Sequence, residues 1–215
     1  ASVVKEKNLT PVVHSDYQIS LLKAYSPTPS FIVKVDVGMG RLGFDAKSAK
    51  KILQDSKLKG HIRGVMSHFS HSDDTSSAIT ESQLHRFLNL ENGGNFGKSI
   101  AASGGILAKP ESHLDWVRPG IMLYGVSPFL GSIGIEHQLN PVMSLKSKII
   151  AVRKFKAGET IGYGGEWTCP EDMCVGIVGC GYGDGYPRSI SPGTSVLIGT
   201  QEVPIIGRVS MDSMS

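Results

Sequence analysis

The sequence has no long hydrophobic run and few cysteines, and these absences narrow the class of protein. No apolar stretch approaches the roughly 20 residues that a membrane-spanning helix needs. The opening residues ASVVKEK contain no signal-peptide core. The cysteines number three, in spacings that match no common zinc site or redox pair, so we expect reduced thiols. These absences favour a cytoplasmic protein that does not enter a membrane.

An excess of charge of one sign is also missing. The 22 Lys and Arg residues oppose 19 Asp and Glu residues, and the basic side chains are scattered along the chain. A nucleic-acid or membrane partner would require a basic stripe, tail or amphipathic segment. We expect neither partner. A hydrophobic content of 40% is sufficient for a sizeable core.

Strand-like and helical runs alternate over residues 1–130, which is typical of βαβ units around a parallel sheet. A helix over 46–54 follows the capping residue Asp45, and Thr80 with Gln83 forms a capping box for a second helix. Strand-like runs lie at residues 31–37, 61–69, 99–103 and 114–117. The pattern predicts an α/β fold in which residues 1–130 form the C-terminal part of a β/α (TIM-type) barrel.

The pattern changes after Gly125, where proline and glycine interrupt strand-like runs that have no helices between them. Successive strand-like runs without helices between them are typical of a mainly antiparallel β domain. We place that domain at residues 131–215. We expect it to be incomplete, because the final residues MDSMS include no closing turn or helix.

The segment VKVDVGMGRLGF contains a G-x-G-x-x-G pattern at Gly38–Gly43, directly after a strand-like run. Such a pattern can bind a dinucleotide when small residues let the pyrophosphate approach backbone amides. Here Met39, Arg41 and Leu42 crowd the loop, so the pattern alone is weak support for that function.

Polar residues at the C-terminal ends of barrel strands are candidates for chemistry, because catalytic groups gather there. A serine hydroxyl at Ser103 and the amides of Gly120 and Ile121 could bind a phosphate, although ordinary turn chemistry is the alternative. The candidates at strand ends are Lys34 with Arg41, His68, Ser103 and Arg118.

Two further segments have competing interpretations. His68–Asp74 holds two imidazoles and two carboxylates, but the spacing fits no common zinc arrangement, so we expect no metal site. In GYGDGYPR, Tyr182 lies in a glycine-rich turn after an apolar strand. It could act as a general base if a nearby cation lowered its pKa, or it could simply fill a hairpin.

Seven segments occur in this order along the chain: KVDVGMGRLGF, GVMSHFSHSDD, AASGG, VRPGIMLYG, IGYGG, GYGDGYPR and GRVSMD. Taken together, these segments resemble the alanine racemase family, whose members are pyridoxal-phosphate enzymes built from a β/α barrel and a C-terminal β domain. The resemblance covers nearly the whole chain and excludes the dinucleotide function.

The resemblance implies roles for the residues at matching positions. Lys34 resembles the carbamylated lysine of the family, whose negative charge would orient Arg41 towards the substrate carboxylate. Arg118 resembles the arginine that faces the pyridine nitrogen and, being always protonated, keeps that nitrogen unprotonated. His68 resembles the imidazole linked to the catalytic tyrosine, and Tyr182 resembles that tyrosine.

The resemblance also implies how the cofactor is bound and how the site is completed. Ser103, Gly120 and Ile121 resemble ligands of the pyridoxal 5'-phosphate group. Tyr182 and Met211 match residues that complete the partner subunit's site, so a homodimer with shared active sites is implied. The implied reaction interconverts L- and D-alanine by transfer of the α-proton between two bases, and supplies D-alanine for peptidoglycan synthesis.

The chain also departs from the family pattern. The family's A-N-A-Y-G-H-G-like motif, with the lysine that holds the cofactor and acts as the second base, has no match in these 215 residues. A further phosphate-binding tyrosine near the end of the family's β domain is also unmatched. We therefore expect this chain to resemble an internal fragment that is inactive by itself. Alternatives are a racemase of serine or another small amino acid, and a non-catalytic pyridoxal-phosphate-binding protein.

Overall fold

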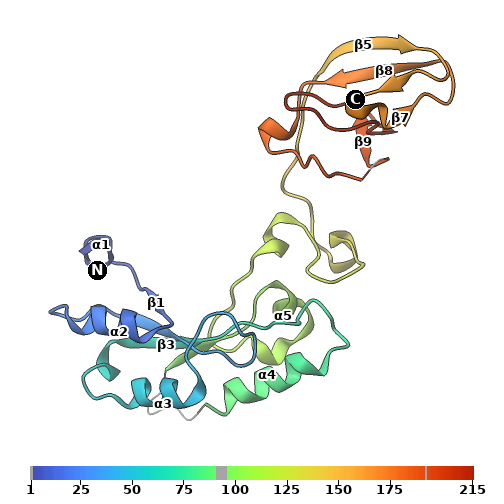
Figure 1. Cartoon of the computed structure of the whole chain (residues 1–215). Coiled ribbons are helices and arrows are strands. Elements are labelled where there is room, and N and C mark those ends of the chain that lie inside the picture. Colours follow the sequence, from blue (N-terminus) through green and yellow to red (C-terminus); the bar gives the residue numbers. More distant parts are fainter. Residues whose placement is uncertain (1, 91–95, 192) are drawn as a thin grey trace. The chain divides into compact units, whose positions relative to one another are not determined.

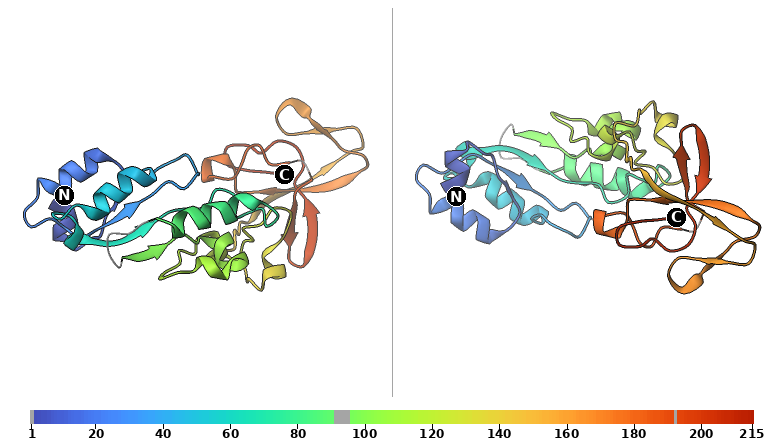
Figure 2. Two further views of the ribbon diagram at one scale, coloured as in Figure 1. Left: turned by 90° about the horizontal axis from the view of Figure 1, so that it is seen from below. Right: turned by 90° about the horizontal axis from the view of Figure 1, so that it is seen from above.

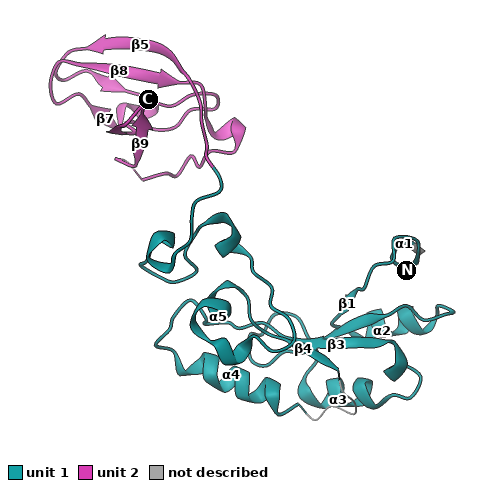
Figure 3. Cartoon of the chain, turned by 180° about the vertical axis from the view of Figure 1, so that it is seen from behind, with its two compact units in different colours: residues 1–143 teal, residues 144–215 magenta. Residues whose placement is uncertain are grey.

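The computed structural model describes residues 2–90, 96–191 and 193–215, and the chain forms two compact units (Figure 3). Unit 1 comprises residues 1–143 and unit 2 comprises residues 144–215. Residues 131–143, which we expected in the β domain, group with unit 1. The reason is that this segment returns to unit 1 through hydrogen bonds such as Val142 N to Tyr124 O at 3.4 Å.

Unit 1 is built around a four-stranded sheet in the order β1-β2-β3-β4, in which every neighbouring pair is parallel (Figure 1). Helices connect these strands, so the expected α/β architecture with part of a barrel is confirmed. The strands are β1 (Val12–Val13), β2 (Phe31–Lys34), β3 (Ile62–Met66) and β4 (Gly97–Ser99). The helices are α1 (Ser2–Glu6), α2 (Asp16–Lys23), α3 (Ala46–Gln54), α4 (Ala78–Leu88) and α5 (Ser103–Ala108). Short 3-10 helices are η1 (Lys59–His61), η2 (Pro110–Ser112), η3 (Ile121–Tyr124) and η4 (Gly134–His137).

The two faces of strand β2 have different surroundings. Phe31, Val33 and Val35 are buried in the core that β2 shares with α3 and α4, whereas Lys34 and Asp36 are only half-buried. Because side chains alternate across a strand, Lys34 and Asp36 lie on the face away from that core. Figures 1 and 2 show α3 and α4 on one face of the sheet, so the polar face is the opposite one.

Helix α3 begins where its capping residue predicts. The Asp45 carboxylate accepts a hydrogen bond from Ser48 N at 2.9 Å, and the helix covers the predicted residues 46–54. Asp45 thus satisfies one of the amides that a helix start leaves unpaired. Within the described residues, no helix is long and apolar enough to cross a membrane.

The second helix differs from the expected one at its start. The N-cap of α4 is Ser77, whose hydroxyl accepts from Ile79 N, so the expected capping box at Thr80 and Gln83 is wrong. Thr80 and Gln83 are buried inside the helix, and Gln83 donates to Ser70 Oγ at 2.8 Å instead. Ser77 precedes the first helical residue by one position and so reaches the unpaired amides first.

Residues 114–117 do not form the expected strand, although the segment runs beside β4. Asp115 N donates to Lys98 O at 3.1 Å, and Arg118 N donates to Ala101 O at 3.0 Å. These isolated bonds do not make a regular ladder. They do fix the start of the loop that carries Arg118.

Unit 2 consists of antiparallel strand pairs, as predicted for the β domain. The pairs are β5 with β8, β6 with β7, and β9 with β10. Cys169, Cys174 and Cys180 are all free thiols in this unit, in agreement with the expected reduced state. The strands are β5 (Ile149–Phe155), β6 (Thr160–Ile161), β7 (Trp167–Thr168), β8 (Met173–Val178), β9 (Ser195–Ile198) and β10 (Gln201–Pro204), and the 3-10 helices are η5 (Tyr163–Gly165) and η6 (Tyr182–Asp184).

Candidate active site

The glycine-rich loop after β2 is filled by a carboxylate of the chain itself. Asp36 accepts hydrogen bonds from the amides of Gly38 and Met39 at 2.8 Å and from Gly40 at 2.9 Å. A dinucleotide fingerprint leaves such amides free for a pyrophosphate at a helix start. Here the loop returns to the strand through an isolated bridge between Val35 and Phe44, and α3 begins only afterwards. The loop therefore presents Arg41 rather than binding a phosphate.

Lys34 is the last residue of β2 and lies in a basic environment. Burial lowers the pKa of its ammonium group, and the charges of Arg41 and Arg118 lower it further, whereas Asp36 raises it. The net effect is a pKa below the ordinary value, which increases the fraction of Lys34 present as the neutral amine. A neutral amine is a nucleophile, while an ammonium group is not.

Arg118 connects the ends of β3 and β4. Its guanidinium donates to Ser67 O at 2.6 Å and also to the hydroxyl of Ser99, and both serines are buried. A third bond reaches Ile100 O at 3.4 Å. These bonds use the two terminal nitrogens, and within the described residues Nε has no partner. The fork thus fixes the plane of the guanidinium and leaves Nε–H available.

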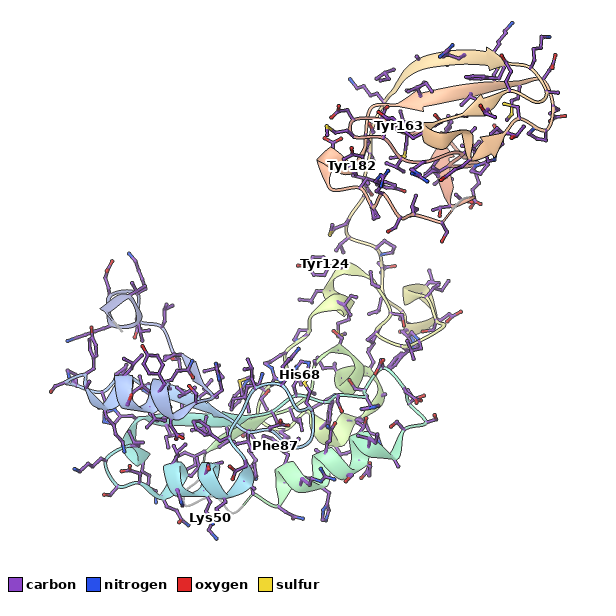
Figure 4. The ribbon with its side chains drawn as sticks, in the orientation of Figure 1. Lys50, His68, Phe87, Tyr124, Tyr163 and Tyr182 are labelled. Carbon is purple, nitrogen blue, oxygen red and sulfur yellow. The ribbon has the colours of Figure 1, made fainter. Side chains whose placement is uncertain are left out.

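His68 lies in unit 1, just beyond the end of β3, and contacts the same guanidinium (Figure 4). Its Nδ1 lies 3.4 Å from Arg118 Nη2. Burial lowers the pKa of the imidazole, and the positive charges of Arg118, Arg41 and Lys34 lower it further. These effects favour the neutral imidazole, whose ring nitrogen can accept a hydrogen bond from the guanidinium.

The rest of the His68–Asp74 segment has hydrogen bonds of its own. His71 Nδ1 lies 2.6 Å from Ser70 Oγ, and the Asp74 carboxylate accepts from the amide and hydroxyl of Ser76. Among the residues that the structure describes, no group of three or more histidine, cysteine, aspartate or glutamate side chains could hold a metal ion.

Ser103 and the loop after Arg118 come together as expected from the sequence. Ser103 begins helix α5 and is buried, and its hydroxyl oxygen accepts from Gly120 N at 3.0 Å and from Met122 N at 3.3 Å. The oxygen therefore has two donors, while the hydroxyl proton has no acceptor in the described part of the chain. The amide of Ile121 is likewise without a backbone partner there. The site therefore has two donors without a partner among the described residues, the Ser103 hydroxyl proton and the Ile121 amide.

Tyr182 and Met211 are neighbours within unit 2. Tyr182 N donates to Ser210 O at 3.0 Å, and Gly183 N donates to Met211 O at 2.7 Å. A Cβ atom at Gly181 would collide with the carbonyl oxygens of Ser210 and Met211, so glycine is required for this close approach. The backbone of the turn is thus fixed against the 210–211 segment.

The side chain of Tyr182 is much less constrained than its backbone. It is 39% exposed, its ring has the Arg188 guanidinium 5.8 Å from the centroid, and its hydroxyl has no hydrogen-bond partner among the described residues. A groove of about 990 Å³ in the same unit lies against β5, β8, β9 and β10, but neither Tyr182 nor Met211 lines it. The groove is therefore separate from the candidate site.

Sequence reasoning missed the residues that hold the site in place. Ser67 and Ser99 were not singled out as functional, yet each accepts a hydrogen bond from Arg118. The available signal was that one serine directly follows β3, next to His68, and another ends β4. Their partners lie far along the chain, so the spacing alone could not reveal the contacts.

Two family models match the chain. The model described as the alanine racemase N-terminal domain matches residues 1–128, and the one described as the C-terminal domain matches residues 142–215. The alanine racemase of Haemophilus influenzae is 44% identical over 218 residues, a match that covers 99% of this chain and 60% of that protein. The biosynthetic alanine racemase of Escherichia coli is 45% identical over 215 residues, covering 97% of this chain and 60% of its own length.

Solved structures agree with these relatives. The biosynthetic alanine racemase of Pseudomonas aeruginosa superposes with a TM-score of 0.90 at 36% identity, covering 99% of this chain and 61% of that one. The alanine racemase of Bartonella henselae with covalently bound pyridoxal phosphate gives 0.81 at 28% identity, covering 99% and 60%. This chain spans about 60% of the length of the curated relatives that it matches. The chain belongs to the alanine racemase family.

Proposed function

We propose that the protein interconverts L- and D-alanine as a pyridoxal-phosphate-dependent racemase. The observation that supports the proposal most strongly is that Lys34, His68 and Arg118 lie close together on the polar face of the sheet. The hydrogen-bonded pair Ser103 and Gly120 follows in the same unit, and the chain belongs to the alanine racemase family. The chain spans only part of its relatives' length, so the proposal concerns the whole protein of which these residues form part.

The residues present fit pyridoxal phosphate. The free hydroxyl proton of Ser103 and the amide of Ile121 are suitable donors to a phosphate group, with Gly120 N holding the Ser103 oxygen in place. When bound, this cofactor supplies an electron sink that eases removal of an α-proton. Arg118 has Nε–H available and would offer it to the ring nitrogen of the cofactor. Burial lowers the pKa of Arg118, yet guanidinium groups remain protonated in proteins, so the ring nitrogen would accept a hydrogen bond without gaining a proton.

Lys34 and Arg41 are proposed to form the binding site for the substrate carboxylate. A neutral Lys34 amine can add carbon dioxide: an N–C bond forms, one N–H proton is released to solvent, and the product is a negatively charged carbamate in place of a basic group. The negative carbamate would then lie among the charges of Arg41 and Arg118, where a positive ammonium is disfavoured. It would attract the Arg41 guanidinium and direct it towards the carboxylate of the amino acid.

Proton transfer is proposed to involve Tyr182 on one face of the substrate. The second base would be the cofactor lysine of a motif that these 215 residues do not contain. Tyr182 and Met211 would complete the site of a second subunit, which makes a homodimer the proposed assembly. Family membership supports a cytoplasmic location and the use of D-alanine in peptidoglycan synthesis as further parts of this proposal.

The test uses the full-length protein, incubated with pyridoxal phosphate, reduced with borohydride and weighed by mass spectrometry. One reduced adduct on a chain heavier than 23.0 kDa, together with conversion of L-alanine to D-alanine, is the expected result. Assays with L-serine under the same conditions measure the preference between the two substrates. A protein that takes up the cofactor but racemises neither amino acid would contradict the proposed function.

A further inference from the structure

Arg41 has to be placed accurately, but its side chain is not held by anything in the described part of the chain. The residue is exposed, and its guanidinium has no hydrogen bond or ion pair there. A long, flexible side chain of this kind takes its position from the backbone that carries it. The question is therefore what fixes the backbone at residues 38–41.

The ends of the loop are fastened to strand β2. Phe44 N donates to Lys34 O and Asp36 N donates to Phe44 O, each at 2.9 Å. Gly43 has φ +139°, and a Cβ there would collide with the backbone of Asp36, so the closure requires glycine. Residues 37–42 form a short loop between these ends, and the hydrogen bonds at the ends do not fix the middle of that loop.

That support comes from the Asp36 carboxylate. Oδ1 accepts from the amides of Gly38 and Met39, and Oδ2 accepts from the amide of Gly40, which directly precedes Arg41. Hydrogen bonds to a charged acceptor are the stronger kind. Burial alone would raise the pKa of Asp36, but the amides of residues 38–41 outweigh it and lower the pKa, so the carboxylate remains charged.

A second contact supports the outer side of the loop. Arg86 of helix α4 donates from Nη1 to Val37 O at 3.2 Å. A Cβ at Gly38 would lie 2.9 Å from that same nitrogen. Two side chains thus hold the loop backbone: the Asp36 carboxylate accepts from its amides, and the Arg86 guanidinium donates to its Val37 carbonyl.

We infer that Asp36 is a positioning residue for the substrate-carboxylate site: by holding the amides of Gly38, Met39 and Gly40, it fixes the point from which Arg41 reaches the substrate. This inference rests on the proposed function for the identity of the substrate. Asp36 itself does not touch the reacting atoms. Its role is to hold the backbone before Arg41 in one conformation when the site is empty and when it is filled.

The sharpest variant is Asp36→Asn in the full-length holoenzyme. Asparagine can still accept from Gly38 and Met39 through one oxygen, but its NH₂ group would face the Gly40 amide, so two donors would oppose each other. Misplacement of a positioning group by about 1 Å can lower a rate by about 100-fold. We expect KM for L-alanine to rise by about 10- to 100-fold, with a smaller decrease in kcat.

Propionate provides a readout that does not depend on turnover. It carries the carboxylate of alanine without the amino group, so its inhibition constant reports on the Arg41 site alone. We expect this constant to rise in Asp36→Asn by the same factor as KM. The matched control is Asp45→Asn, because Asp45 also accepts from a backbone amide but caps α3 instead of holding the loop. Both constants should remain within about twofold of wild type in the control.

Hydrogen exchange over residues 37–43 separates this inference from the proposed function. We expect slow exchange at Gly38, Met39 and Gly40 in the wild type, and faster exchange in Asp36→Asn but not in Asp45→Asn. Rapid exchange in the wild type would overturn the inference even if no variant folds. Unchanged KM and propionate inhibition in a folded Asp36→Asn variant would also overturn it. Absence of racemase activity in the wild type, with protected loop amides, would overturn the proposed function instead.

Discussion

Units 1 and 2 hold their candidate functional residues in different ways. In unit 1, the Arg118 side chain itself is fixed by Ser67 O, Ser99 and His68. In unit 2, only the backbone of Tyr182 is fixed, while its hydroxyl has no partner in the described residues. Unit 1 therefore holds its candidate residues through hydrogen-bonded side chains, whereas unit 2 holds the backbone of Tyr182 and leaves its hydroxyl without a partner in the described residues.

This difference has a consequence for substitutions. A change to Arg118 removes bonds that also join β3 to β4, so folding and activity should fall together. Truncating Tyr182 removes a hydroxyl that contributes no hydrogen bond to unit 2, so activity should fall alone. The comparison can be tested by measuring stability and activity for the same variants.

The largest expected effect is on activity in Tyr182→Phe. Loss of a positioned general base lowers rates by about 10²- to 10⁴-fold, so we expect α-proton exchange from L-alanine to decrease by that factor. Cofactor binding and the urea midpoint should be unchanged. Tyr17→Phe, at an exposed tyrosine of α2, is the matched control. Unaltered exchange in Tyr182→Phe would remove Tyr182 as the base.

The next effect is on stability in Arg118→Lys. Lysine keeps the charge but not the fork, so Ser67 O or Ser99 Oγ loses its donor inside a buried site. An unsatisfied buried polar group costs about 1–3 kcal/mol, and we expect the free energy of unfolding to fall by that amount, together with activity. Arg63→Lys, on the exposed side of β3, should cost less than about 0.5 kcal/mol. Full stability in Arg118→Lys would show that the side-chain network does not support unit 1.

What the sequence could predict depended on how far apart the bonded residues lie along the chain. Local signals were sufficient for α3, because Asp45 and the helix that it caps are adjacent in the chain. They failed at Gln83, which looked like part of a capping box but instead bonds to Ser70 in the preceding loop. The bonds from Arg118 to Ser67 and Ser99 span larger separations still, so no periodicity or spacing could reveal them.

The candidate site was predicted in part for the same physical reason. The rule that barrel chemistry lies at strand ends pointed to Lys34, His68 and Ser103 from the residues alone, whereas the role expected for Met211 came only from the family resemblance. The turn at Tyr182 was visible because a dense run of glycine marks a close backbone approach. What that turn approaches, the 210–211 segment, became evident only in the structure.

A pair of glycine variants measures how rigid the turn in unit 2 is. Gly181→Ala would place a Cβ against the carbonyls of Ser210 and Met211, and we expect a loss of about 1–3 kcal/mol, because backbone atoms cannot move aside easily. Gly185→Ala meets no atom within 4 Å but has φ +92°, so it should cost about 1 kcal/mol. Urea unfolding compares the two. Equal losses would mean that the close contact at Gly181 does not hold the turn.

The smallest expected effect is a pH dependence that arises from His68 in unit 1. Burial, followed by the charges of Arg118, Arg41 and Lys34, lowers the folded-state pKa of His68 below its ordinary value of 6.5. At a pH between the folded-state and unfolded-state pKa values, His68 binds more protons in the unfolded chain than in the folded one. The contribution of His68 to the free energy of unfolding is therefore fully present above the unfolded-state pKa and is lost as the pH falls towards the folded-state pKa. The loss should be modest, because the imidazole is only partly buried and solvent screens the charges.

His68→Gln removes the titrating group and should therefore flatten this part of the stability curve. We expect the wild type to lose stability relative to the variant as urea unfolding is moved from about pH 7.5 to about pH 5.5. The same substitution at His85, an exposed residue of α4, is the control and should follow the wild type. Parallel curves for His68→Gln and the wild type would show that the cationic surroundings of His68 do not disfavour its protonation. That result would leave the hydrogen bonds of Arg118 untouched, because they are tested separately by the stability of Arg118→Lys.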